Sequence, residues 1–287
     1  MARSRTEDAA GSHELRLGGG TTTSQASMAG PAGPAGWQAV TQALAKALSP
    51  AGLDLVHPLR AGWWARAAER AGRPELALPH PDGALMVLVG NSRALWAPFC
   101  AAFAAGRLDS GRPLDDYVEG VLREAADPLP GAAGDAAGKT LYLTTEQYSI
   151  GPDSTNTSYV PFQRIAAAAG LAELVEAVHL SIHPEFGPWF ALRGLLVFDG
   201  VDGPPQEPAR LEGLLGAAVL EEAQAAFDAA LAATKELAYP LPEGEEGAWR
   251  KFVAMRDAAA RGRGGEHRYS DRQILYHYTN DLAAIAP

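Results

Sequence analysis

The sequence has 287 residues and a mass of 30.1 kDa, with 47% hydrophobic and 20% charged residues. One folded body of this length buries roughly 70–75% of its unfolded surface, so a large core is possible without disulfides. The net charge of −10 excludes broad contact with nucleic acid or an anionic membrane, because both need a basic surface. The single cysteine, Cys100, excludes a disulfide framework and a cysteine zinc cage. We therefore expect a cytoplasmic protein.

Residues 1–35 are rich in Gly, Ser, Thr and Ala and lack hydrophobic periodicity. This composition predicts a disordered N-terminal tail. A transit peptide is the alternative, although Glu7, Asp8 and Glu14 are acidic and such peptides avoid acidic residues.

Helices and strands are interspersed over the remainder of the chain. Helical spacing, with proline and glycine stops, predicts helices at 37–48, 63–71, 95–105, 114–126, 161–176, 211–238, 249–260 and 269–278. Short apolar or alternating runs predict strands at 53–58, 84–89, 141–145, 178–182 and 189–198. Gly187-Pro188 favours a hairpin between the last two strands. We expect one α+β domain over residues 36–287.

Two tempting motifs do not support a site. Gly134 to Thr140 resembles a phosphate-binding loop, but its glycines are separated by three residues and a strand, not a helix, follows. His183 stands before a proline at the end of a strand, which favours a structural histidine over a ligand.

The segment Ile182 to Gly194, with the sequence IHPEFGPWFALRG, carries the most information. It places Arg193 in an apolar strand, which is costly unless the guanidinium meets an anion or a carboxylate. An internal ion pair is the alternative to a ligand site at Arg193. Arg256, next to Asp257, raises the same question, with a surface ion pair as its alternative.

This segment resembles the central motif of the methylmalonic aciduria and homocystinuria type C family (CblC), which has the form IHPRFGGWFAIRG. The family pattern RD…RYSEEQ…Y is similar to Arg256-Asp257, to 268–273 (RYSDRQ) and to Tyr276. The N-terminal half follows in order with 53–58 (LDLVHP) and 78–81 (LPHP). The resemblance runs from about Trp37 to Tyr278.

The resemblance implies an α+β fold of the flavin-reductase or nitroreductase type, in which helices flank a mixed sheet. It implies a cobalamin chaperone and processing enzyme that binds cobalamin with its nucleotide base detached and removes the upper axial ligand. Cyanide would leave reductively, with FAD or FMN as the cofactor, and alkyl groups would pass to glutathione. The implied partners are a downstream cobalamin-trafficking protein or methionine synthase.

The resemblance also implies site residues. Arg193 and Arg256 fall on positions that hold glutathione and favour its thiolate. The positions that match cobalamin or cofactor contacts are Gln147, Val160, Pro161, Phe162, Gln163, Ser181, Leu192 and Tyr269.

Three features depart from the family pattern. Ser181 stands where the family often has cysteine, Glu185 replaces an arginine, and the segment between Gly170 and Ser181 is shorter. Two alternatives therefore stay open: a non-catalytic cobalamin carrier, and a flavin-dependent oxidoreductase of the nitroreductase type.

Overall fold

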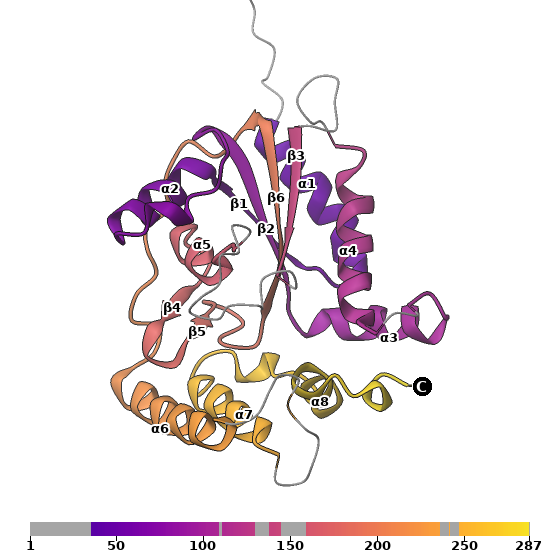
Figure 1. The fold of residues 1–287 in the computed structure, drawn as a ribbon, viewed down its shortest axis with the longest axis vertical. Helices are drawn as coiled ribbons and strands as arrows, with labels where there is room; N and C mark the ends of the chain where they lie inside the picture. Colours follow the sequence, from indigo (N-terminus) through magenta and orange to yellow (C-terminus); the bar gives the residue numbers. More distant parts are fainter. Residues whose placement is uncertain are drawn as a thin grey trace, which may run out of the picture. The chain divides into compact units, whose positions relative to one another are not determined.

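A four-stranded sheet in the order β1-β2-β6-β3 organises the computed structural model (Figure 1). Residues 34–287 form one compact unit. The structure describes residues 36–108, 111–129, 138–144, 159–235, 241 and 247–286. The strands of the sheet are β1 (Leu55–Arg60), β2 (Ala84–Asn91), β3 (Lys139–Leu143) and β6 (Ala191–Asp202).

All pairs in this sheet are antiparallel, which corrects the mixed sheet implied by the resemblance. The reason is visible at the first connection. α2 (Ala61–Arg70) starts directly after Arg60, and Arg60 pairs with Leu85 at the start of β2. The chain thus returns at the end of β1 that it left, whereas a parallel partner must start at the opposite end.

β2 is buried along its whole length because helices cover both faces of the sheet. Successive side chains of a strand point to opposite faces. Leu85, Val87 and Val89 belong to one core cluster, and Met86 and Leu88 belong to another. The continuous apolar run in the sequence therefore reflects two cores that share one strand.

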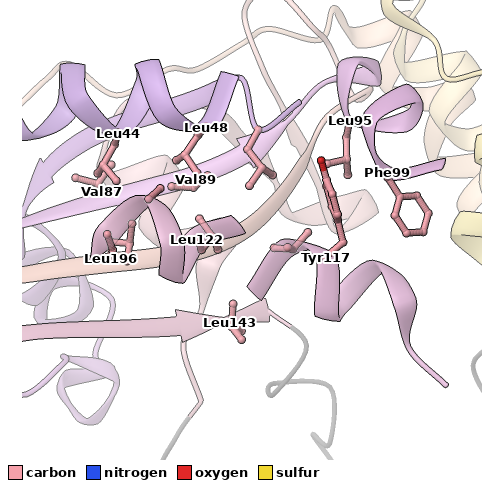
Figure 2. Packing of buried hydrophobic residues seen from close by; sticks show 14 of the residues in the cluster. Leu44, Leu48, Val87, Val89, Leu95, Phe99, Tyr117, Leu122, Leu143 and Leu196 are labelled. Atoms are coloured by element: carbon pink, nitrogen blue, oxygen red, sulfur yellow. The ribbon is translucent and has the colours of Figure 1, made fainter. Parts of the chain in front are cut away.

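The first core lies between the sheet and α1 (Gly36–Leu48), α3 (Trp96–Ala104) and α4 (Pro113–Ala126). Figure 2 shows Leu44 and Leu48 of α1 pointing toward Val87 and Val89. The second core packs α2 and α5 (Phe162–Ala168) on the other face, with Trp63, Trp64 and Ile165 as members. Figure 1 shows α4 and α5 on opposite sides of β6.

The remaining elements form two further clusters. α6 (Ala217–Thr234) and α7 (Trp249–Ala259) pack on a two-stranded sheet of β4 (Glu173–Val175) and β5 (Leu180–Ile182). α8 (Asp271–Thr279) packs with α7 around Trp189 and Trp249. Among the described helices, none is long and apolar enough to cross a membrane.

The helix predicted over residues 161–176 is too long. α5 ends at Ala168, and Gly170 follows with φ +67°. A glycine in the left-handed region is a common helix stop. The next residues pair as β4 with β5, so tertiary pairing overrides the helix propensity of the alanines.

The predicted hairpin is wrong, although its tight turn is present. His183 and Gly187 exchange two backbone hydrogen bonds of 2.8 and 2.9 Å. β5 nevertheless pairs with β4, while β6 pairs with β2 and β3. β6 is apolar on both faces over Leu195–Phe198, so it takes a central place in the larger sheet.

The helix predicted from residue 211 begins only at Ala217. The Glu173 carboxylate accepts hydrogen bonds from the backbone N–H groups of Gly213, at 3.0 Å, and Leu214, at 2.6 Å. These bonds hold the preceding residues in a non-helical loop. Residues 236–238, the predicted end of this helix, lie outside the described residues.

The other helices agree with the prediction to within two residues at each end. The predicted strands differ from the observed ones by up to four residues at their ends, most at the C-terminal end of β6, while the start of β2 and the end of β5 are exact.

Candidate active site

A β-bulge at Arg193 creates the first part of the site. Val89 pairs with Gly194, yet the next residue, Gly90, pairs with Leu192, so Arg193 has no partner on β2. A bulge of this kind redirects a side chain and ends regular pairing. The sequence permits it because a Cβ on Gly90 would lie 2.6 Å from the carbonyl oxygen of Ala191.

The bulge also reverses the alternation of β6. Leu195 and Val197 face the core of α2 and α5, and Leu192 packs against this same core. In an unbroken strand Leu192 would face the other side of the sheet, because an odd number of residues separates it from Leu195 and from Val197. The inserted residue thus frees Arg193 from either core.

The buried amide of Asn91 holds the Arg193 side chain. Arg193 Nε donates to Asn91 Oδ1 at 2.6 Å, and Asn91 is fully buried. The carbonyl of Arg193 accepts from Thr144 Oγ1 at 3.3 Å. Arg193 forms no ion pair with any of the described residues.

Arg256 is fixed by two oxygen atoms from elsewhere in the fold. Its Nε donates to Tyr278 Oη at 3.1 Å, and its Nη1 donates to the carbonyl of Pro188 at 2.5 Å. Asp257 instead pairs with Arg268, at 2.8 Å. Asp257 therefore does not pair with its neighbour Arg256.

The turn at 183–188 is locked against the loop between α7 and α8. Gly187 has φ +56°, and a Cβ there would lie 2.4 Å from the carbonyl oxygen of Arg263. A Cβ on Gly264 would lie 2.4 Å from the carbonyl carbon of Phe186. Only glycine allows two backbones this close. The lock fixes Pro188, whose carbonyl receives Arg256.

His183 stabilises the same turn, as the sequence indicates. Its Nδ1 accepts hydrogen bonds from the backbone N–H groups of Glu185, at 3.1 Å, and Phe186, at 3.2 Å. Burial, followed by the nearby His57 and His267, lowers the pKa of His183 to about 4. The imidazole is therefore neutral at pH 7 and keeps the lone pair that the turn needs.

A cavity of about 860 Å³ opens beside the bulge. This volume is in the upper part of the range of about 300–1,000 Å³ that is typical of small-molecule sites. Two groups of lining residues differ in chemistry. The apolar wall consists of Val160, Pro161, Phe162, Leu174 and Leu180. The charged wall consists of Arg112, Asp115, Arg193, Arg256 and His277.

The two walls come from different parts of the fold. The apolar wall belongs to the start of α5 and to β4 and β5. The charged wall comes from the start of α4, the bulged end of β6, α7 and α8. Because α4 and α5 cover opposite faces of the sheet, the cavity at the end of β6 combines residues from both faces.

The charged wall holds its arginines beside a neutral histidine. Burial, followed by Arg256 and Arg193, lowers the pKa of His277 to about 3. Burial raises the pKa of Asp115, while the charges of Arg112 and Arg193 act in the opposite direction. At pH 7 the wall therefore has an excess of positive charge, in a chain whose net charge is −10. Such a wall favours anionic groups.

Ser181 lies under the apolar wall with an unused hydroxyl. The residue is 7% exposed and lines the cavity, and its Oγ has no hydrogen-bond partner among the described residues. An unsatisfied buried hydroxyl costs about 1–3 kcal/mol. A polar group of a ligand could supply the missing partner.

Comparison with known proteins shows that the chain is similar to a curated sequence and to a solved structure. The chain is 28% identical to a chicken (Gallus gallus) protein named cyanocobalamin reductase / alkylcobalamin dealkylase, over 180 residues that cover 58% of the chain and 69% of the relative. It is similar to the crystal structure of a C. elegans B12-trafficking protein, CblC, described as a human MMACHC homologue. That match has a TM-score of 0.62 and 16% identity, and it covers 88% of this chain and 96% of the neighbour.

The resemblance to CblC is confirmed. No family model matches the sequence. The structural match, at 16% identity, establishes the fold alone. The name of the chicken relative contains both activities that the resemblance to CblC implies.

Most of the site residues that the CblC resemblance implied lie around the one cavity. Those that line it are Val160, Pro161, Phe162, Gln163, Ser181, Leu192, Arg193 and Arg256. Gln147 lies outside the described residues. Tyr269 does not line the cavity; it is 4% exposed, and its Oη lies 3.5 Å from both Nδ2 and the carbonyl oxygen of Asn91. Burial raises the pKa of Tyr269 to about 12, so it stays a neutral phenol.

Sequence reasoning missed Arg112, Asp115, Phe190 and His277, which also line the cavity. Phe190 lies within the 182–194 motif but was not singled out. Arg112, Asp115 and His277 carry no motif, and only the tertiary fold brings them to the cavity. The bulge did leave a signal, because Gly90 and Gly194 interrupt two apolar strands. Glycine inside a strand often marks a bulge or a close backbone approach.

Lys139 and Cys100 are residues of reactive types, and both have structural surroundings. Lys139 Nζ donates to the carbonyls of Ala126, Asp127 and Leu129 at 3.0–3.1 Å, at the end of α4. A cation stabilises this negative end of a helix. Cys100 lies in α3, and burial raises the pKa of its thiol.

Proposed function

We propose that this chain is a cobalamin-processing protein that binds cobalamin with its base detached and removes the upper axial ligand. The observation that carries the proposal is the cavity of about 860 Å³, in which an apolar wall and a charged wall meet at the end of β6. The chicken relative, with its named activities, supports the same assignment.

The apolar wall suits the corrin. A corrin is a broad disc with an apolar rim and amide side chains, so it needs apolar contact and a few hydrogen-bonding groups. Phe162 and Leu192 offer apolar surface, and the unsatisfied Ser181 hydroxyl offers a hydrogen bond to an amide. Gln163 Nε2 donates to the carbonyl of His179 at 3.2 Å. The amide oxygen of Gln163 would then accept a hydrogen bond from the ligand.

The charged wall suits glutathione. Arg193 and Arg256 can each pair with one of the two carboxylates of glutathione. A free thiol has a pKa of about 8.5, and nearby guanidinium groups lower it, which favours the reactive thiolate. Cys100 does not line the cavity, so the thiol has to come from a second substrate.

Dealkylation is then a displacement at the carbon bound to cobalt. The thiolate sulfur forms a bond to the alkyl carbon while the cobalt–carbon bond breaks. The electron pair of that bond stays on the metal, so Co(III) becomes Co(I) and a thioether leaves. The arginines hold the thiol substrate, and its proton leaves to solvent when the thiolate forms.

Cyanide removal needs electrons in place of a nucleophile. The guanidinium groups of Arg193 and Arg256 could hold a flavin phosphate as well as a carboxylate, so the charged wall fits FAD or FMN. A bound reduced flavin would supply the electrons that release cyanide from cobalt. The chain itself would contribute the site that keeps the corrin near this donor.

We assign residues 36–287 to a single cobalamin-processing domain with a flavin-reductase or nitroreductase type of fold. The protein would work in the cytoplasm as a cobalamin chaperone. Its cargo would pass to a downstream cobalamin-trafficking protein or to methionine synthase.

The test follows the visible spectrum of methylcobalamin mixed with the purified full chain, first alone and then with glutathione, without oxygen. A shift to the base-off spectrum, followed by loss of the methylcobalamin bands and formation of S-methylglutathione, is the expected result. A base-off shift without turnover would identify a carrier. No shift at all, with flavin retained on purification, would identify a nitroreductase-type enzyme.

Arginine variants separate the two walls. Arg193→Ala and Arg256→Ala should raise the glutathione concentration for half-maximal dealkylation by about 10-fold or more, because a hydrogen bond to a charged group contributes about 1.5–3 kcal/mol. Cobalamin binding should stay nearly unchanged. Ser181→Ala, next to the apolar wall, should weaken cobalamin binding and leave the glutathione requirement nearly unchanged. Equal loss of both ligands in the arginine variants would show that these residues are structural.

A further inference from the structure

The charged wall contains one carboxylate among its three arginines. Arg112 Nη1 lies 3.6 Å from Asp115 Oδ2, and the charge of Arg193 also acts on Asp115. Arg193 and Arg256 are each held in place by neutral oxygen acceptors, the Asn91 amide and the Pro188 carbonyl. Asp115 forms no ion pair with either of them. Its ion pair with Arg112 is long, at 3.6 Å, and the Arg112 side chain is 67% exposed, so this pair stabilises the fold little.

The neighbouring Asp116 shows that helix stability does not explain Asp115. Both lie in the first turn of α4, where a negative charge stabilises a helix of 14 residues. Asp116 does so while exposed to solvent and outside the cavity lining. Asp115 is only 25% exposed at its side chain, and burial raises its pKa. Its carboxylate is thus partly desolvated at a place where it faces the cavity.

We propose that Asp115 binds the ammonium group of the thiol substrate. This inference rests on the proposed function and specifies its second substrate. Glutathione carries two carboxylates and one ammonium group. Among the described residues, the charged wall carries three guanidinium groups and one carboxylate. Arg164 and Glu176 also line the cavity, but they pair with each other at 2.9 Å and so add no net charge. The wall is thus complementary to a zwitterion of this pattern. Asp115 would discriminate an amino-acid thiol from a purely anionic thiol.

The deciding experiment compares two ligands against two variants. The ligands are glutathione and its deamino analogue, in which hydrogen replaces the ammonium group. The variants are Asp115→Asn and Asp116→Asn, which remove the same charge from adjacent positions of one helix turn. Isothermal titration measures binding of each ligand to the full chain, and the base-off shift of cobalamin confirms that each variant is folded.

Asp115→Asn should raise the dissociation constant of glutathione about 10-fold, because one charge-assisted hydrogen bond is lost. It should leave the deamino analogue unchanged or slightly better bound, because the analogue has no ammonium group to lose. Asp116→Asn should change neither constant by more than about twofold, as expected for an exposed charge.

Two outcomes overturn the inference alone. Equal weakening of both ligands by Asp115→Asn would mean that Asp115 only positions the arginines. Unchanged glutathione binding would mean that it contacts no ligand. Failure of the wild-type chain to bind glutathione at all would overturn the inference together with the thiol half of the proposed function, while cobalamin binding would still be measured separately.

Discussion

Two parts of β6 have different roles: one packs in the cores, and the other lines the cavity. Leu195–Phe198, the pleated half, alternates between two apolar cores and pairs regularly with β2 and β3. Ala191–Gly194, the bulged half, breaks this alternation and lines the cavity with Leu192 and Arg193. One strand thus supplies both rigidity and a redirected charge. A charge at the end of a well-packed strand is held more rigidly than one on a loop.

The sharpest test of the pleated half is Leu196→Ala. Leu196 is 2% exposed. It belongs to the core that α1 and α4 cover, and Figure 2 shows it among the packed side chains of that core. The substitution should lower the free energy of unfolding by about 2–5 kcal/mol, since it removes buried methyl groups and leaves a cavity. Denaturant unfolding measures this change. Ligand affinity of the folded fraction should stay the same, and a parallel loss of affinity would show that the halves are not separable.

The turn that supports the bulged half is tested by two glycines of one loop. Gly262 and Gly264 have φ values of +78° and +77°, so alanine is strained equally at both. A Cβ on Gly262 meets nothing within 4 Å, whereas a Cβ on Gly264 meets the backbone of Phe186 and Gly187. Gly264→Ala should therefore destabilise the protein by about 1–3 kcal/mol more than Gly262→Ala, the usual range for overpacking.

Gly264→Ala should also weaken glutathione binding, because the displaced turn carries the Pro188 carbonyl that holds Arg256. Isothermal titration of both variants separates this effect from stability. If the two variants bind glutathione equally well, the turn does not position Arg256.

The pH dependence of stability provides a third test of the turn at 183–188, because His183 takes up a proton when the chain unfolds. The pKa of His183 is lowered from 6.5 to about 4 in the folded chain. Between these values the unfolded chain binds the proton and the folded chain does not, so the free energy of unfolding falls as the pH falls. We expect a loss on the order of 1 kcal/mol or more between pH 6.5 and 4.5, since one pKa unit corresponds to about 1.4 kcal/mol.

His183→Asn is the matched variant, because its amide oxygen can still accept a backbone hydrogen bond but does not titrate. Its stability should depend less steeply on pH over this window. Burial also lowers the pKa of His57, so part of the slope remains. An unchanged slope would show that the turn does not depend on a neutral His183.

The sequence predicted the elements that local patterns determine, but it did not predict those that depend on distant partners. Local patterns were sufficient where one element decides its own structure: the apolar run of β2 and the stops of α1 and α4 were read correctly. They failed where a distant partner decides. β4 replaces the end of a predicted helix because β5 lies beside it, and Glu173 prevents the loop before α6 from becoming helical.

The candidate site follows the same rule. The motif at 182–194 and Arg256 identified the residues near the bulge, because their positions carry a family pattern. Asp115 and His277 reach the cavity only through the packing of α4 and α8, and no local feature marks them. Asn91, which orients Arg193, was likewise invisible in the sequence because its bond spans 102 residues.

The smallest expected effect concerns the bulge itself. Thr144→Val removes the hydroxyl that donates to the Arg193 carbonyl and keeps the shape of the side chain. The bulged residue has no partner on β2, and Thr144 follows the last residue of β3, so this bond continues the pairing of β3 by one residue. Its loss should cost about 0.5–1.5 kcal/mol, the net contribution of a neutral hydrogen bond. Thr140→Val, within the regular part of β3, is the control for the loss of a hydroxyl. If the two variants unfold at the same denaturant concentration, the Thr144 bond does not stabilise the bulge, which then depends on Asn91, Gly90 and Gly194.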